Sequence, residues 1–235
     1  IRDHQGGLPQ GVRRGARQLS LPAIGAVLML RDPQDFSARG FARQDPSDDA
    51  LFYSVARKVV HIDEGAIAAL TGFLSEQLSP GGNYLDLMSS WRSHLPPDLG
   101  GHITGLGMNA EELADNPQLD EWVVHDLNAG PRLPFADRHF DAVICTVSVQ
   151  YMIRPLDIFR EVERVLEPGA PFIVSFSNRC FPQKAIALWL AMADAEHVEL
   201  VRSYFGDGWD GVATRSYLPE HADPLFIVWA NRSAG

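Results

Sequence analysis

Cysteine is scarce in this chain, and no apolar run is long enough to cross a membrane. Cys145 and Cys180 are the only cysteines in 235 residues, which is too few for a disulfide framework and favours a reducing compartment. No CxxC or HExxH pattern occurs, so we expect no dedicated transition-metal site. The apolar stretch of residues 19–30 is interrupted by Pro22. It is too short for a transmembrane segment.

Basic residues are also fewer than acidic residues. Twenty Lys and Arg residues stand against 30 Asp and Glu residues, giving a formal net charge of -10. Because nucleic-acid backbones are bound through clustered cations, this balance argues against broad contact with nucleic acid or with an anionic membrane. The length is sufficient for one α/β domain with a substantial core. The oligomeric state stays open.

The first 50 residues lack any sustained hydrophobic period. Gly, Pro, Arg and Asp are mixed there, which predicts an N-terminal arm that is partly disordered. The chain begins at Ile1, and Arg13, Arg14 and Arg17 precede an apolar run. Residues 1–30 are therefore either a remnant of a targeting peptide, which implies organellar (plastid-type) import, or an ordinary irregular arm. Without such import we expect a cytoplasmic protein.

Residues 51–235 alternate short apolar runs with helical patterns. Strands are expected at 83–88, 102–106, 121–125, 140–147, 171–176, 212–218 and 225–230, and helices at 62–78, from 109, and at 155–166, 184–193 and 196–205. This alternation with short links predicts an α/β fold with helices on both faces of a seven-stranded, mostly parallel, Rossmann-like sheet whose last strand is antiparallel.

Two acidic residues end the first and third expected strands. Asp86 follows Tyr84-Leu85, and Asp126 follows the run from Trp122 to His125. In open α/β sheets the ligand lies beyond the carboxyl ends of the strands. Both carboxylates are therefore expected where a nucleoside-like ligand would be held.

Two longer passages match a known family. Residues 133–143 read LPFADRHFDAV, a turn leading into an apolar strand, and residues 160–170 read REVERVLEPGA, a helix that stops before the next strand. The chain from about residue 53 onward thus resembles the class I S-adenosylmethionine-dependent methyltransferases. The resemblance implies S-adenosylmethionine as cofactor and methyl transfer to a small-molecule acceptor that the sequence does not identify.

The resemblance also implies where this cofactor binds. Asp126 would contact the adenine through its carboxylate and the following backbone amide, and Met108 would pack on the adenine face. The residues expected to bind the cofactor are Asp86, Met88, Ser89, Ser90, Met108, Asn109, Asp126, Leu127 and Thr146.

The loop after the first strand departs from the family pattern. The family has glycines at three alternate positions, which allow a positive φ and close approach of the backbone to the ligand. Here Met88, Ser90 and Arg92 stand in those places. We expect the hydroxyls of Ser89 and Ser90 to compensate by hydrogen bonding to the cofactor's carboxylate, with Arg92 or His94 adding charge.

A second departure follows the second strand, where the family has an acid that holds the ribose hydroxyls. Gly107 stands at that position. Asn109 can donate and accept hydrogen bonds and is a candidate substitute. The alternative is that Asn109 simply caps the following helix.

Tyr151 and His61 are the candidate catalytic residues. Tyr151 follows the fourth strand, where the family places the transferring methyl group, and His61 lies in a segment that often forms a lid in the family. Either could take a proton from the acceptor. The alternatives are that Tyr151 packs against the helix beginning at Pro155 and that His61 is structural.

Two other functions compete with methyl transfer. The departures from the family loop are also compatible with a non-catalytic, methyltransferase-like protein that serves for binding or scaffolding. A nicotinamide-dependent oxidoreductase would carry G-x-G-x-x-G after the first strand. Residues 88–93 contain no glycine, so we rank the oxidoreductase last.

Overall fold

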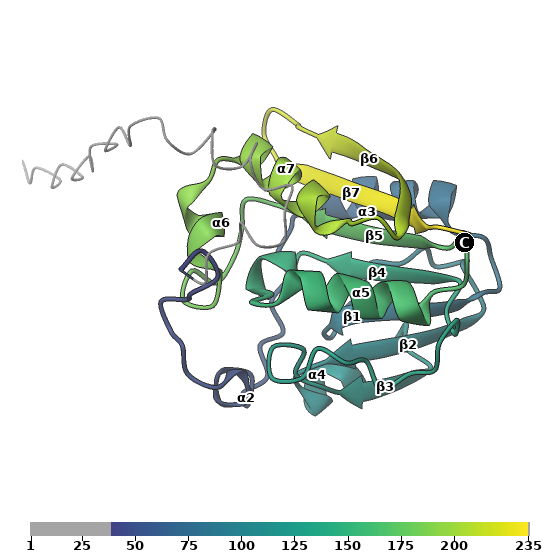
Figure 1. Ribbon diagram of the computed structural model, residues 1–235, viewed down its shortest axis with the longest axis horizontal. Helices are drawn as coiled ribbons and strands as arrows, with labels where there is room; N and C mark the ends of the chain where they lie inside the picture. The colour runs from purple at the N-terminus through teal and green to yellow at the C-terminus, as the bar shows by residue number, and fades with distance from the viewer. Residues whose placement is uncertain (1–38, 235) are drawn as a thin grey trace, which may run out of the picture.

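A seven-stranded sheet forms the centre of the protein (Figure 1). The computed structural model describes residues 39–234. The strand order is β3-β2-β1-β4-β5-β7-β6, in which β1 to β5 are parallel and β7 is antiparallel to both its neighbours. This confirms the expected fold. The strands are β1 (Asn83–Ser89), β2 (His102–Gly107), β3 (Glu121–Val124), β4 (Ala142–Thr146), β5 (Pro171–Phe176), β6 (Trp209–Tyr217) and β7 (Leu225–Arg232).

Helices cover both faces of this sheet, as expected (Figure 1). The helix α3 (Glu64–Gln77) belongs to one buried apolar cluster with Tyr84 and Ile144. The helices α5 (Pro155–Val165) and α7 (Asp194–Tyr204) belong to the other cluster, together with Leu85 and Val143. Successive residues of a strand point to opposite faces. The near-continuous apolar runs of β1 and β4 therefore supply both clusters at once.

The helix ends follow their sequence signals. Asp63 caps α3 by accepting a hydrogen bond from the backbone N–H of Ala66 at 2.9 Å. Pro155 occupies the first turn of α5, where its missing N–H costs no hydrogen bond. The short helix α4 (Ala110–Ala114) begins after Asn109, whose side chain accepts from the Glu112 N–H at 3.0 Å. Asn109 therefore caps α4, as one of its two interpretations predicted.

The segment before α3 crosses the carboxyl edge of the sheet. It contains α2 (Asp49–Phe52), which Figure 1 shows beyond that edge. Asp49 is buried, and its Oδ1 lies 2.7 Å from Arg43 Nη1 and 3.2 Å from the Nζ of Lys184. These ion pairs attach residues 43–49 to the connection after β5. The possible targeting remnant, residues 1–30, lies outside the described residues.

One expected helix is shorter in the structure than in the prediction. The helix expected from residue 184 begins instead as α6 (Ala187–Ala191). Lys184 is fully buried, with Asp45 Oδ2 at 3.1 Å from its Nζ. Between residues 39 and 234, no helix is both long and apolar enough to cross a membrane.

Candidate cofactor-binding site

A cavity of about 120 Å³ lies beyond the carboxyl ends of β1, β2, β3 and β4. Because a single buried water needs only roughly 10–15 Å³, this volume suits an organic ligand. The structure brings every sequence-predicted site residue to its wall. These residues are His61, Asp86, Met88, Ser89, Ser90, Met108, Asn109, Asp126, Leu127, Thr146 and Tyr151.

The first loop keeps a glycine-like backbone without a glycine. The ladder between β1 and β2 is interrupted between Leu87 and Ser89. Met88 at this bulge has a φ of 60°, in the left-handed region that favours glycine. The departure from the family pattern thus changes the side chain at residue 88 but leaves the unusual backbone conformation in place.

This bulge explains the missing acid after β2. A Cβ atom at Gly107 would lie 2.2 Å from the carbonyl oxygen of Ser89. No real Cβ makes so short a contact, and the obstructing atom belongs to the backbone. Residue 107 therefore cannot carry any side chain while the Ser89 carbonyl stays in place.

Serine hydroxyls hold the loop by donating to buried carboxylates. Ser89 and Ser93 donate to Asp86 Oδ2 at 2.5 and 2.6 Å, and Ser90 donates to Glu112 Oε2 at 2.5 Å. Each hydroxyl has one proton to donate, so those of Ser89 and Ser90 serve the protein's own acids here. Asn116 adds support by donating to the Ser90 carbonyl at 2.8 Å.

Asp86 is almost completely buried, with 2% of its surface exposed. Burial raises the pKa of this carboxyl to about 6, against the opposing effect of the two serine hydroxyls. A buried carboxylate in such a cavity attracts a cationic ligand more strongly than an exposed one would.

Several polar atoms on the cavity wall have no partner within the described part of the protein. Asp126 Oδ1 accepts from the backbone N–H groups of Asn128 and Ala129 at 2.8 and 3.1 Å. Within residues 39–234, Asp126 Oδ2 and the N–H of Leu127 make no hydrogen bond. Thr146 Oγ1 is buried and also lacks a partner among these residues. The free atoms of Asp126 and Leu127 suit an adenine, whereas Thr146 lies at the end of β4, next to β1.

Asn109 has less capacity for a ligand. Besides capping α4, its side-chain nitrogen donates to the Tyr53 carbonyl at 2.8 Å. Both ends of the amide thus serve internal contacts.

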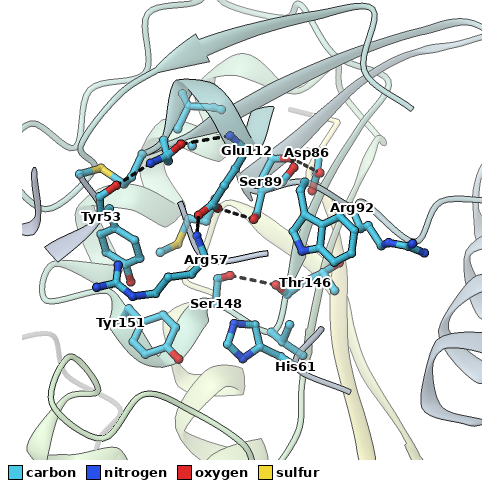
Figure 2. A pocket seen from close by; sticks show the side chains of 18 of the residues that line it. Tyr53, Arg57, His61, Asp86, Ser89, Arg92, Glu112, Thr146, Ser148 and Tyr151 are labelled. Atoms are coloured by element: carbon cyan, nitrogen blue, oxygen red, sulfur yellow. Dashed lines mark hydrogen bonds between the residues drawn. The ribbon is translucent and has the colours of Figure 1, made fainter. Parts of the chain in front are cut away.

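Glu112 is the residue that sequence reasoning missed. It lines the cavity with 8% of its surface exposed. Figure 2 shows its carboxylate in the middle of the site, where Oε1 accepts from the Arg57 N–H at 2.6 Å. The only signal in the sequence was its place three residues after Asn109, which is also the place of an ordinary first-turn acid.

The two candidate catalytic residues lie near one another in the close view (Figure 2). Tyr151 Oη accepts from the Phe181 N–H at 2.8 Å, and burial raises the Tyr151 pKa to about 12. The imidazole of His61 packs edge-on against the Phe181 ring, with the two ring centroids 4.8 Å apart. No described residue hydrogen bonds to it, and burial lowers the His61 pKa. The His61 imidazole is therefore free of internal hydrogen bonds among the described residues, whereas the Tyr151 hydroxyl already has a partner.

The segment of residues 53–61 closes one side of the cavity. Trp91 Nε1 donates to the Val59 carbonyl at 3.1 Å, so the first loop and this segment are attached directly. At the same side, the guanidinium of Arg92 stacks on Trp91 at 4.5 Å. Burial, with the nearby charge of Arg92, lowers the pKa of His94.

The fold and this cavity define an α/β protein with a ligand-sized cavity at the carboxyl edge of a mostly parallel sheet. Residues 90–174 match a family model described as a methyltransferase domain. The resemblance to class I S-adenosylmethionine-dependent methyltransferases is thereby confirmed.

One curated relative is similar over a short part of the chain, which spans about a quarter of that relative's length, and two solved structures share the fold. A malonyl-acyl-carrier-protein O-methyltransferase of Marinomonas sp. is 33% identical over 67 residues, which are 28% of this chain and 25% of that protein. The PH0226 protein of Pyrococcus horikoshii shares the fold with a TM-score of 0.56 at 18% identity, covering 78% of this chain and 99% of its own. The cyclase SpnF shares it with a TM-score of 0.55 at 17% identity, covering 80% and 93%.

Proposed function

We propose that this protein is an S-adenosylmethionine-dependent methyltransferase that acts on a small molecule. The observation that carries the proposal is the cavity at the ends of β1 to β4, which Asp86, Asp126 and Thr146 all line. The free polar atoms of Asp126 and Leu127 suit a nucleoside, and the buried carboxylates of Asp86 and Glu112 suit a positively charged donor. The match of residues 90–174 to a methyltransferase domain supports the same conclusion.

In this proposal Asp126 and Leu127 would hold the adenine, and the loop of residues 88–93 would hold the methionine end. The bound cofactor supplies a sulfonium that is already activated for methyl transfer. The charge of the sulfonium is stabilised by the nearby carboxylates. Because the hydroxyls of Ser89 and Ser90 donate to Asp86 and Glu112, Arg92 is the better candidate for the cofactor's carboxylate.

The protein's contribution to the reaction is chiefly to hold donor and acceptor in line. We assign proton removal from an oxygen or nitrogen acceptor to His61, whose imidazole lines the cavity without a hydrogen-bond partner among the described residues. Tyr151 would position Phe181 and the cavity wall, because its hydroxyl already accepts a backbone hydrogen bond. The His61 imidazole would take the proton that the acceptor loses when it is methylated.

Isothermal titration with S-adenosylmethionine and S-adenosylhomocysteine tests the cofactor assignment. We expect saturable binding of both. The absence of any heat signal up to millimolar ligand would end the proposal.

The role of His61 is tested by transfer of a radiolabelled methyl group into the small-molecule fraction of a cell extract. His61→Gln is expected to lower the initial rate by roughly 100-fold or more, while S-adenosylhomocysteine affinity stays within about threefold. His221→Gln replaces an exposed imidazole of the same chain and is the matched control. Equal rates for the two variants would remove His61 from the mechanism.

A non-catalytic binding protein is the second candidate. Two observations favour it, namely the commitment of the loop hydroxyls to internal acids and the exclusion of any side chain at residue 107. The likeness to SpnF adds that this fold also occurs in a protein named as a cyclase. Binding of S-adenosylhomocysteine without any labelled product, across extracts of several sources, would favour this candidate.

A further inference from the structure

A ribose presents two neighbouring hydroxyls, and in the resembling family an acid at the end of β2 receives them. This chain cannot place an acid there, since a Cβ at Gly107 would collide with the Ser89 carbonyl oxygen at 2.2 Å. A nucleoside in the cavity would therefore need another acceptor of its hydroxyl protons on the same wall.

Glu112 has the position that this role requires. It lies in α4, directly after β2, and side chains of a helix lean toward its N-terminus, which here is the cavity side. The residue lines the cavity, and only 8% of its surface is exposed. Figure 2 shows the carboxylate reaching from α4 into the space between Arg57 and Ser89.

The carboxylate of Glu112 also has acceptor capacity to spare. An ionised carboxylate offers about four acceptor positions. Among the described residues it receives two donors, the Arg57 N–H at 2.6 Å on Oε1 and the Ser90 hydroxyl at 2.5 Å on Oε2. About two positions thus remain, one on each oxygen, which matches the two donors of a ribose diol.

We propose that Glu112 accepts the ribose hydroxyls of the bound nucleoside, in place of the acid that residue 107 cannot carry. The identity of the ligand rests on the proposed function. Glu112 would then join three parts of the site, because the same carboxylate already links the segment at Arg57 to the loop at Ser90. Nucleoside binding would stabilise that junction.

The proposal is tested by measuring the affinities of two ligands for the wild-type protein and for two variants. S-Adenosylhomocysteine and its 2′,3′-dideoxy analogue are titrated into the wild-type protein, Glu112→Gln and Glu111→Gln. The wild type is expected to prefer the hydroxyl-bearing ligand by at least tenfold. Glu112→Gln is expected to lose about tenfold in affinity for that ligand and little for the analogue, so that the preference falls to within about threefold. Glu111→Gln, an exposed neighbour in the same helix, should keep the wild-type preference.

Two results would overturn the assignment. A Glu112→Gln variant that weakens both ligands equally would show a structural role only. A wild-type protein with no preference between the two ligands would refute the assignment even if the variant fails to fold. Failure of the wild type to bind either ligand would instead overturn the proposed function, and with it this assignment.

Discussion

Replacing Asp86 with asparagine is expected to stabilise the protein near neutral pH while weakening cofactor binding. The carboxyl of Asp86 is buried, and burial raises its pKa from 3.8 to about 6. At neutral pH the folded protein therefore contains an ionised group in a poorly solvated place. Asparagine has nearly the same shape, and its side-chain oxygen can still accept from Ser89 and Ser93.

The rise of the Asp86 pKa from 3.8 to about 6 gives the cost of the buried charge to stability. At about 1.36 kcal/mol for each tenfold change in proton affinity, this cost is about 3 kcal/mol. The direction of the pH dependence of stability follows from the raised pKa of Asp86. Because the folded state holds this proton more tightly, the contribution to stability is fully present below the ordinary pKa. It is lost as pH rises through about 6. The stability difference between Asp86→Asn and wild type should therefore grow by about 2 kcal/mol between roughly pH 4.5 and 7.5.

Denaturant unfolding at several pH values measures this difference. A poor fit of the new amide would add a constant offset, so the pH dependence of the difference is the diagnostic quantity. Asp98→Asn, which removes an exposed carboxylate of the same chain, is the control. If the Asp86→Asn difference stays flat within about 0.5 kcal/mol, the burial argument for Asp86 is wrong.

Three further outcomes are expected. Gly107→Ala should lower the free energy of unfolding by roughly 2 kcal/mol or more in thermal melts, whereas Gly72→Ala, an open helical position, should raise it by about 0.5–1 kcal/mol; equal effects would contradict the clash. Met88→Gly should stabilise by up to about 1 kcal/mol, because the φ of 60° strains methionine; destabilisation would refute the strain. Binding of S-adenosylmethionine should weaken as pH falls through about 6 and Asp86 becomes protonated. The change should be smaller for S-adenosylhomocysteine, which lacks the sulfonium charge. Equal pH profiles for the two ligands would show that Asp86 does not interact with the sulfonium.

Most strands could be predicted from the sequence because their signals are local. The apolar run of residues 171–176 between turn residues became β5 with the expected bounds. The run of residues 140–147 became the shorter β4, because Phe140 forms an isolated bridge with Leu166 and Val147 takes a φ of 46°. Such ends depend on which neighbours the strand meets, and local hydrophobicity does not contain that information.

Glu111 and Glu112 illustrate the limit most clearly. The two acids are adjacent and share the first turn of α4, so sequence patterns treat them alike. In the folded protein Glu111 is exposed, whereas Glu112 is buried in the cavity and bonded to Arg57 and Ser90. Only the approach of two distant segments separates them.

The sequence by itself determined the order of the elements and the placement of Asp86 and Asp126 at one edge of the sheet. Hydrophobic periodicity and turn residues act over a few positions, and parallel strands bring their carboxyl ends together. Only the tertiary structure decided where the serine protons go, why residue 107 must be glycine, and which acid faces the ligand. Those answers depend on contacts between β1, α4 and the segment before α3, which no local pattern encodes.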